Sequence, residues 1–278
     1  MGVTRDVQPL RDALAGRYRI EREIGRGGMA TVYRAEPVDG EGTVAIKVLR
    51  PELAVALGAD RFHREVEILG RLRHPGIVPV LDSGEVGRLL YLVMPYVPGE
   101  NLRARLDREG QLQLPLALSI VAELTAALDY AHRERIVHRD IKPENVLLDG
   151  ARTLICDFGL ARAIDRAALE PLSSSGLVIG TPAYMSPEQA MGQEPVGTAS
   201  DIYALGCVVF EMLTGEMPFP GLTRQAVIAR HLTEAPRSMR TVRPDLPESV
   251  ERAVGAALAK SPHDRPASGA ELLRRLSP

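Results

Sequence analysis

The most informative part of this sequence is His138-Arg139-Asp140-Ile141-Lys142-Pro143-Glu144-Asn145, and Asp157-Phe158-Gly159 begins twelve residues after its last position. Two short apolar runs lie between these motifs and predict a pair of strands joined by a turn. Such a hairpin would bring Asp140, Asn145 and Asp157 close together. Two carboxylates and one amide oxygen are hard ligands that suit Mg²⁺. An Asp-Phe-Gly turn alone indicates little, but both motifs in this order and spacing predict a metal and phosphate site.

A glycine cluster near the N-terminus predicts a second phosphate contact. Its sequence is Gly25-Arg26-Gly27-Gly28-Met29-Ala30, which has the spacing of the dinucleotide-binding fingerprint when Ala30 takes the last place. That fingerprint needs a helix to begin there, whereas residues 31–33 are strand formers. We therefore predict a glycine flap between two strands, whose amides approach phosphates closely because no Cβ is in the way. A flexible hairpin turn without a ligand is the alternative.

Lysine is scarce in this chain, which has only Lys47, Lys142 and Lys260 among its 34 basic residues. A lysine in so arginine-rich a chain is favoured where a compact, flexible ammonium is needed. Lys47 ends an apolar strand pattern, and Glu65 lies on the apolar arc of a helix predicted over 59–73. A buried carboxylate needs a cation, so a Lys47–Glu65 pair would aim the ammonium at phosphate oxygens. An edge-strand cation in water is the alternative.

The first third of the chain is rich in strand patterns. Residues 1–17 contain a short helical pattern, which we interpret as an extension outside the main core. The predicted elements that follow are strands over 18–26, 30–36 and 43–49, the helix over 59–73, and a hairpin joining 77–81 to 89–93 through Ser83-Gly84-Glu85.

From residue 98 onward the patterns become helical. Helices are predicted from Pro115, from Ser200 or Asp201 to Leu213, and over 222–233, 247–259 and 267–276. The sequence thus predicts a small, mostly β lobe joined near residues 94–99 to a larger, mostly helical lobe. The seam between two such lobes is a natural ligand cleft.

Composition narrows the function classes. The chain has 278 residues with 34 basic and 36 acidic side chains. Basic side chains are therefore not in excess, and the composition does not indicate a surface that binds nucleic acid or a membrane. Cys156 and Cys207 have neither metal-binding nor disulfide spacing, and a reducing cytoplasmic compartment fits them best. We predict no secretory signal and no membrane-spanning segment in this chain. If the chain is part of a longer protein, that protein is expected to carry a membrane anchor.

The motifs together resemble those of eukaryotic-type protein kinases, and most of all the bacterial Hanks-type Ser/Thr kinases. The resemblance is carried by Gly25-x-Gly27, Val44-Ala45-Ile46-Lys47, Glu65, His138-Arg139-Asp140, Asn145, Asp157-Phe158-Gly159, Gly180-Thr181-Pro182-Ala183-Tyr184-Met185 and Ser186-Pro187-Glu188. It implies an α+β bilobal fold, with a kinase domain over 18–274 after the extension 1–17. The N-lobe would comprise 18–96 and the C-lobe 97–274.

The resemblance also implies roles for single residues. Asp140 would accept or orient the substrate hydroxyl proton, and Lys142 would neutralise the γ-phosphate. Lys47, positioned by Glu65, would hold the α- and β-phosphates. The Mg²⁺ ligands, which would also accept Mn²⁺, would be Asn145 and Asp157. The ATP-binding residues would be Ile24, Gly25, Arg26, Gly27, Gly28, Met29, Ala30, Val32, Ala45, Lys47, Met94, Pro95, Val97 and Leu147.

The segment from Asp157 to Glu188 resembles a kinase activation segment. Its expected phosphorylation sites are Ser173, Ser174, Ser175 and Thr181, although a solvated serine loop is the alternative. Arg139 would pair with a phosphate there. Glu188 would form a buried ion pair with Arg265. Asp201 would brace the catalytic-loop backbone or cap its own helix.

The function that these residues imply is a bacterial signalling enzyme, a non-specific Ser/Thr protein kinase that also phosphorylates its own activation segment. Its partners would be ATP and proteins with Ser or Thr acceptors, with a homodimer through the N-lobe and no nucleic acid. A non-catalytic scaffold would predict loss of Lys47, Asp140, Asn145 or Asp157, and none is lost. A small-molecule kinase is disfavoured by Lys142 and by the long activation segment.

Overall fold

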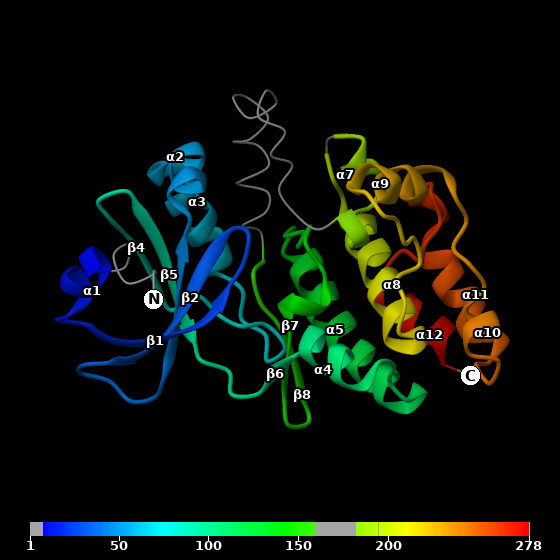
Figure 1. The fold of residues 1–278 in the computed structure, drawn as a ribbon, viewed down its shortest axis with the longest axis horizontal. Helices are drawn as coiled ribbons and strands as arrows, with labels where there is room; N and C mark the ends of the chain where they lie inside the picture. Colours follow the sequence, from blue (N-terminus) through cyan, green and yellow to red (C-terminus); the bar gives the residue numbers. More distant parts are fainter. Residues whose placement is uncertain (1–7, 159–181, 194, 278) are drawn as a thin grey trace. The chain divides into compact units, whose positions relative to one another are not determined.

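The structure is a computed structural model that describes residues 8–158, 182–193 and 195–277 (Figure 1). Within these residues the chain forms two compact units. Unit 1 contains residues 8–73 and 78–98, and unit 2 contains residues 74–77, 99–158 and 182–277 apart from position 194.

Unit 1 is built on a five-stranded antiparallel sheet with the order β1-β2-β3-β5-β4. The strands are β1 (Tyr18–Arg26), β2 (Ala30–Pro37), β3 (Val44–Leu49), β4 (Asp82–Val86) and β5 (Leu89–Pro95). Three helices accompany the sheet, α1 (Gln8–Leu14), α2 (Pro51–Leu57) and α3 (Ala59–Leu69). The central strand β3 is buried at every position except Lys47, which is half-buried. Strand β3 is therefore apolar and buried apart from the single cation Lys47.

The hairpin predicted around Ser83-Gly84-Glu85 is wrong, because these residues lie inside β4 and the turn falls at Gly87-Arg88. Gly87 has φ +62°, a left-handed conformation that glycine adopts without strain. Gly84 is needed for another reason, since a Cβ there would lie 2.5 Å from the Tyr91 hydroxyl oxygen on β5. The predicted strand 77–81 is absent from the described sheet.

The helical pattern at the N-terminus forms α1, but the prediction that it lies outside the main core is wrong. Leu10 and Leu14 are fully buried in the hydrophobic core of unit 1, with Tyr33 and Tyr91 in the same cluster. Arg17, just after the helix, donates hydrogen bonds to Asp82 at 2.9 Å and to the Tyr91 hydroxyl at 2.5 Å. The α1 helix therefore belongs structurally to the β-rich unit.

Unit 2 is mostly helical. Its helices are α4 (Leu102–Glu109), α5 (Leu114–Arg133), α7 (Pro187–Ala190), α8 (Thr198–Thr214), α9 (Arg224–Thr233), α10 (Met239–Val242), α11 (Glu248–Ala257) and α12 (Gly269–Leu276). A small sheet has the order β6 (Glu100–Asn101), β7 (Val146–Asp149) and β8 (Arg152–Ile155). Three 3-10 turns complete the described part, namely η1 (Pro143–Asn145), η2 (Pro182–Tyr184) and η3 (Pro262–Asp264).

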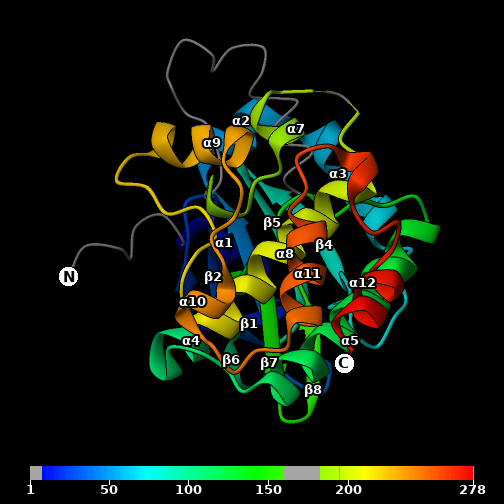
Figure 2. The same ribbon diagram turned by 90° about the vertical axis from the view of Figure 1, so that its right-hand side faces the viewer.

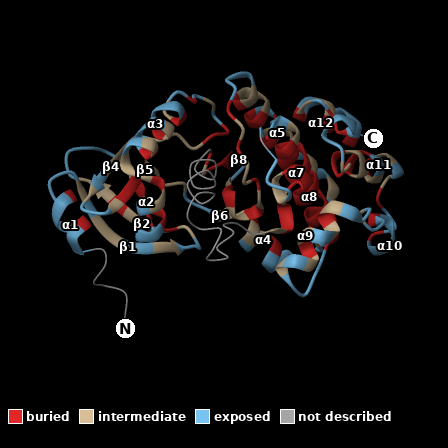
Figure 3. Ribbon diagram, turned by 90° about the horizontal axis from the view of Figure 1, so that it is seen from above, coloured by how far each residue is buried: buried red, intermediate tan, exposed pale blue. Residues whose placement is uncertain are grey.

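Helix α8 forms the buried axis of unit 2, since every residue from 200 to 214 is buried (Figure 3). It packs against α5, α10 and α11 (Figure 2). The helix begins at Thr198 after the N-cap Gly197, so Asp201 lies in its first turn and does not cap it. This leaves the Asp201 carboxylate available for other backbone donors.

Helix α5 is the one described helix that is long and apolar enough to cross a membrane by length and composition. Its apolar side chains are nevertheless used inside unit 2, where Ile120, Leu124 and Leu128 are buried. The helix packs against α8 and α12. Burial in the core of unit 2 therefore accounts for its composition.

Candidate functional site

The backbone of the catalytic-loop motif 138–145 is held by a buried carboxylate. Asp201 is fully buried and accepts hydrogen bonds from the backbone N–H groups of His138 and Arg139, each at 2.8 Å. Its third contact is the Nε2 of His132, at 2.7 Å. A carboxylate with three donors is well satisfied in a buried position. Asp201 thus fixes the start of the loop from helix α8.

His138 connects this loop to the end of β8. The ring is fully buried, and its Nε2 donates to the carbonyl oxygen of Cys156 at 2.9 Å. Its Nδ1 accepts the backbone N–H of Asp140 at 3.2 Å, so the neutral ring carries its proton on Nε2. The ring also contacts Phe158 edge-on, with centroids 4.5 Å apart. Both predicted motifs therefore meet at one histidine.

The Asp140 carboxylate lies between two donors. Lys142 Nζ is 2.6 Å from Asp140 Oδ2, and Asn145 Nδ2 donates to Asp140 Oδ2 at 3.2 Å and to the Asp140 carbonyl at 2.8 Å. The Asp140 side chain keeps 21% of its surface exposed. It is therefore oriented by the loop and still reachable by a ligand, which is what a general base or hydroxyl-positioning group requires.

Two residues of the motifs adopt left-handed backbone conformations, Arg139 with φ +70° and Asp157 with φ +67°. Such conformations are uncommon for residues with a Cβ and gather at functional sites. Arg139 is held there by its N–H bond to Asp201. Asp157 follows Cys156, whose N–H donates to the Asn145 carbonyl at 3.0 Å. The β7–β8 hairpin thus brings the Asp157 backbone next to η1, as the spacing predicts.

The predicted metal ligands are Asn145 and Asp157. Because Asn145 uses its amide nitrogen to hold Asp140, its Oδ1 remains the atom that could face a cation. Among the described residues, no group of three or more His, Cys, Asp or Glu side chains could hold a metal ion. One amide and one carboxylate oxygen fit a hard cation that takes its other ligands from phosphate and water.

In unit 1 five of the predicted nucleotide residues share one face of the sheet. In antiparallel strands, directly opposed residues project to the same face, as do alternate residues along one strand. Val32 is opposite Lys47, and Ala45 is opposite Met94. Ala30 is opposite Leu49, two positions after Lys47. The register thus places Ala30, Val32, Ala45, Lys47 and Met94 on one face.

The glycine flap forms the turn between β1 and β2. Its closing hydrogen bond runs from the Gly27 N–H to the Ala30 carbonyl at 2.9 Å. A Cβ added to Gly25 or Gly28 would meet nothing within 4 Å. Packing inside unit 1 therefore does not require glycine at these two positions, and the space beside the backbone there is open. Ile24 and Arg26 lie in β1, Gly28 and Met29 lie in the turn, Pro95 ends β5, Val97 follows it, and Leu147 lies on β7 in unit 2.

Glu65 lies on α3 and is half-buried, whereas Glu67 is exposed. Phe62, Val66 and Leu69 of the same helix are buried, so the helical arc expected from the sequence is correct. The helix ends at Leu69, four residues earlier than predicted, with Gly70 as its C-cap. No hydrogen bond or ion pair of Glu65 is found within the described part of the chain, so its pairing with Lys47 stays a prediction.

Glu188 and Arg265 form a buried bidentate ion pair. Arg265 Nη1 and Nη2 each donate to one Glu188 carboxylate oxygen at 2.8 Å, and Ser200 Oγ donates to the same carboxylate at 2.5 Å. Burial raises the pKa of Glu188, but the hydrogen bonds from Arg265 and Ser200 outweigh it and lower the pKa to about 2. The pair therefore stays charged and ties the segment after Thr181 to the C-terminal part of unit 2.

A second anchor of this segment was not predicted from the sequence. Tyr184 Oη donates to Glu211 Oε2 at 2.6 Å, and Arg103 Nη1 donates to Glu211 Oε1 at 2.6 Å. Burial and the nearby Glu211 carboxylate raise the pKa of Tyr184, so the phenol stays protonated. The signal was present in the sequence, because a glutamate inside the apolar stretch 202–213 needs buried partners.

Gln189 was missed too, and its Nε2 donates to the Arg139 carbonyl at 2.8 Å. The predicted phosphorylation sites Ser173, Ser174, Ser175 and Thr181 lie outside the described residues.

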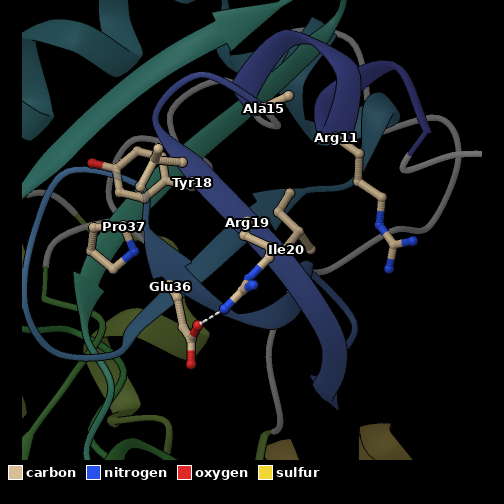
Figure 4. A pocket seen from close by; sticks show the side chains of 8 residues that line it. Arg11, Ala15, Tyr18, Arg19, Ile20, Glu36 and Pro37 are labelled. Atoms are coloured by element: carbon tan, nitrogen blue, oxygen red, sulfur yellow. Dashed lines mark hydrogen bonds and ion pairs between the residues drawn. The ribbon is translucent and has the colours of Figure 1, made fainter.

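A cavity of about 520 Å³ lies between α1 and the start of β1 in unit 1 (Figure 4). The side chains that line it are Arg11, Ala15, Tyr18, Arg19, Ile20, Glu36, Pro37 and Val38. Arg19 and Glu36 point toward one another and form an ion pair, whereas Arg11 points away from them. None of these residues belongs to the predicted site, so this cavity is not a candidate for it.

Comparisons with known proteins agree with this geometry. The family profile described as "Protein kinase domain" matches residues 18–275. The serine/threonine-protein kinase PrkC of Bacillus subtilis is 41% identical over 257 residues, covering 91% of this chain and 39% of the relative. The serine/threonine-protein kinase PknH of Mycobacterium tuberculosis is 38% identical over 263 residues, covering 94% of this chain and 41% of the relative. The chain thus spans about two fifths of the length of these curated relatives.

Two solved structures share the fold. The PknI kinase domain of Mycobacterium tuberculosis has a TM-score of 0.73 at 31% identity and covers 94% of this chain and 95% of its own. The structure of Rad53 residues 1–466 in complex with AMP-PNP has a TM-score of 0.78 at 26% identity, with coverage of 94% and 65%.

Proposed function

This chain belongs to the protein kinase family, with serine/threonine-protein kinases as relatives, and we propose that it transfers the γ-phosphate of ATP to Ser and Thr hydroxyls of proteins. The observation that carries the proposal is the Asp140 carboxylate, held 2.6 Å from Lys142 Nζ on a loop braced by the buried Asp201. Family membership implies ATP, a divalent metal and protein substrates in general.

Asp140 would orient the acceptor hydroxyl and take its proton as the new O–P bond forms. Lys142 would neutralise charge on the transferred phosphate, because its ammonium is already beside the base. Phosphoryl transfer needs little covalent help from a protein, so positioning and charge neutralisation supply most of the rate, and turnover is expected at about 1–100 per second. Arg139 would pair with a phosphorylated Ser173, Ser174, Ser175 or Thr181 and order that segment.

Asn145 and Asp157 would hold Mg²⁺ or Mn²⁺. When bound, that ion would offset the negative charge of the nucleotide phosphates. Lys47, supported by Glu65, would contact the α- and β-phosphates, and the backbone of the glycine flap would approach them. Val32, Ala45 and Met94 would contact adenine on the sheet face that they share, together with Leu147. A relative of the same fold was solved with the nucleotide analogue AMP-PNP, which supports a nucleotide ligand here.

We propose a cytoplasmic location for this domain, membrane anchoring elsewhere in a longer protein, and homodimer formation through unit 1. The relatives are longer, since this chain spans two fifths of their length, which supports only the premise of a longer protein. Sedimentation of the purified chain with and without ATP tests the dimer. A single monomeric species at all concentrations would exclude the proposed homodimer.

The activity is tested by transfer of radiolabelled γ-phosphate from ATP to the chain itself and to myelin basic protein. Asp140→Asn should reduce both transfers by about 10³-fold or more, because the base and hydroxyl-orienting group is lost. Asp149→Asn is the matched control, since this carboxylate pairs with Arg152 at the surface of unit 2. Equal transfer by Asp140→Asn and the wild-type chain would exclude the role of Asp140.

A further inference from the structure

Gln189, on the short helix α7, makes hydrogen bonds in two directions. Its Oε1 accepts the backbone N–H of Ser186 at 3.1 Å, and its Nε2 donates to the carbonyl oxygen of Arg139 at 2.8 Å. The N–H can only donate and the carbonyl can only accept, so these two partners fix the orientation of the Gln189 amide. One side chain therefore joins the start of α7 to the loop 138–145.

The Ser186 end of this connection is anchored in the interior of unit 2. Ser186 is fully buried and is the N-cap of α7, where it forms a capping box with Gln189. Its Oγ also lies 3.2 Å from the Oγ of Ser200, which is buried on α8. The amide of Gln189 is therefore held on a buried support, although the side chain itself is only half-buried.

The buried ion pair extends this support. The Ser200 hydroxyl donates to Glu188, and Arg265 holds the same carboxylate. The Arg265 guanidinium carbon lies 4.8 Å from the centroid of the Tyr203 ring on α8. A connected set of polar side chains thus runs from Arg265 through Glu188, Ser200 and Ser186 to Gln189. It ends at the carbonyl of the residue that precedes Asp140.

The other end of the connection is the peptide group between Arg139 and Asp140. The N–H of this peptide donates to His138 Nδ1 at 3.2 Å, so His138 holds its nitrogen end while Gln189 holds its carbonyl end. Arg139 has φ +70°, a conformation that a residue with a Cβ keeps only where its neighbours fix it. The direction in which the Asp140 side chain leaves the backbone depends on this peptide plane.

We propose that Gln189 is a positioning residue for Asp140, because its Nε2–H holds the peptide before Asp140 in the orientation that aims the carboxylate at the acceptor hydroxyl. The inference rests on the proposed kinase function and adds to it a residue that acts only through the loop backbone. Asp201 holds the N–H groups of His138 and Arg139, and Gln189 supplies the matching donor for the Arg139 carbonyl.

Gln189→Glu separates the two hydrogen bonds of the side chain. A carboxylate still accepts the Ser186 N–H, and glutamate suits this position of a capping box, so the melting temperature should be unchanged. The carboxylate cannot donate to the Arg139 carbonyl, and its charge would repel that oxygen. We expect kcat to fall about tenfold with the KM for ATP within about twofold of wild type, because a displaced Asp140 slows transfer without weakening nucleotide binding.

Two further variants separate the missing donor from the added charge. Gln189→Met removes the donor without adding charge and should lower kcat about threefold. Gln193→Glu is the matched control, since it introduces the same charge at an exposed glutamine four residues further along the chain. This control should leave kcat, the KM for ATP and the melting temperature unchanged.

The measurements use the whole chain. Initial rates of phosphate transfer to myelin basic protein give kcat and KM, and hydrogen–deuterium exchange read by mass spectrometry needs no turnover. In Gln189→Glu, amide exchange should be faster in the loop 138–145 and unchanged in residues 186–192. If the wild-type chain transfers no phosphate, the proposed function is contradicted, whereas the exchange still tests Gln189.

Three results would overturn the inference. The first is an unchanged kcat, or unchanged exchange in the loop 138–145, for Gln189→Glu. The second is equally faster exchange in both segments, since that result describes a structural role in α7 only. The third is a loss of kcat in Gln193→Glu as large as in Gln189→Glu, because charge alone would then explain the effect.

Discussion

The loop 138–145 of unit 2, which we propose is catalytic, and the sheet face of unit 1, which we propose binds the nucleotide, are held in place by different interactions. In the loop, the backbone and side chains are held by hydrogen bonds with buried residues, namely Asp201, His138 and Asn145. On the sheet face, Val32, Ala45 and Met94 are placed by strand register, and the glycine flap is left open. Mutations in the loop should therefore affect stability and activity together, whereas those in the flap should affect ligand binding alone.

Asp201→Ala should give the largest effect. It removes the acceptor of two backbone N–H groups and of His132, and leaves these donors buried. We expect the free energy of unfolding to fall by about 3–5 kcal/mol, measured by urea denaturation, together with loss of phosphate transfer. Asp149→Ala, which breaks only the surface pair with Arg152, should cost less than about 1 kcal/mol. An Asp201→Ala chain as stable as wild type would contradict the claim that buried hydrogen bonds hold the loop 138–145 of unit 2.

Glu188→Gln should destabilise the chain by about 3 kcal/mol at pH 7, because it leaves the buried Arg265 without its counter-charge. The pH dependence sharpens this expectation. The pKa of Glu188 is about 2 in the folded chain against an ordinary value of 4.5, so its contribution is complete above pH 4.5 and is lost as pH falls toward 2. Urea denaturation at pH 7 and pH 3 should therefore show a smaller loss of stability for Glu188→Gln than for wild type. Parallel losses would contradict the role of the pair.

Leu10→Ala tests whether α1 belongs to the core of unit 1. Leu10 is fully buried, so we expect the free energy of unfolding to fall by about 2–4 kcal/mol. Val38→Ala is the control, since Val38 is 53% exposed and should change stability by less than about 0.5 kcal/mol. If both variants unfold at the same urea concentration as wild type, α1 is an extension outside the core, as the sequence pattern had predicted.

Gly28→Ala should have the smallest effect on stability and a selective effect on the nucleotide. An added Cβ meets nothing within 4 Å, so the free energy of unfolding should stay within about 0.5 kcal/mol of wild type. The KM for ATP should rise about threefold, because the methyl group keeps the backbone away from phosphate. An unchanged KM for ATP, measured by initial rates, would mean that the flap does not approach the nucleotide.

Local patterns predicted much of this arrangement. The bounds of β1 agree with the expected strand 18–26, and the β7–β8 hairpin follows from the spacing between the two catalytic motifs. Errors occurred where the environment of a residue depends on a partner in another element. The position of Gly84 is set by Tyr91 on the next strand, and the burial of Leu10 by a sheet that begins after it. Neither partner can be identified from periodicity.

The same reasoning explains why the Tyr184–Glu211 contact was missed. The charge inside an apolar helix indicated a buried partner, but its identity depends on how η2 packs against α8. Asp201 was easier to interpret, because its motif spacing is shared with a known family. Its alternative role as a helix cap is removed by the N-cap at Gly197.

Asp201, Tyr203 and Glu211 all lie on α8, one continuous helix of 17 residues. A helix advances about 1.5 Å and turns about 100° per residue, so the spacing between these three groups is fixed by its pitch. One residue inserted between positions 203 and 211 would swing Glu211 a quarter turn away from Tyr184 while leaving Asp201 in place. Substitutions along α8 can be absorbed one at a time, but a change in its length cannot, so descendants of this sequence should vary in the loops around α8 and keep its residue count.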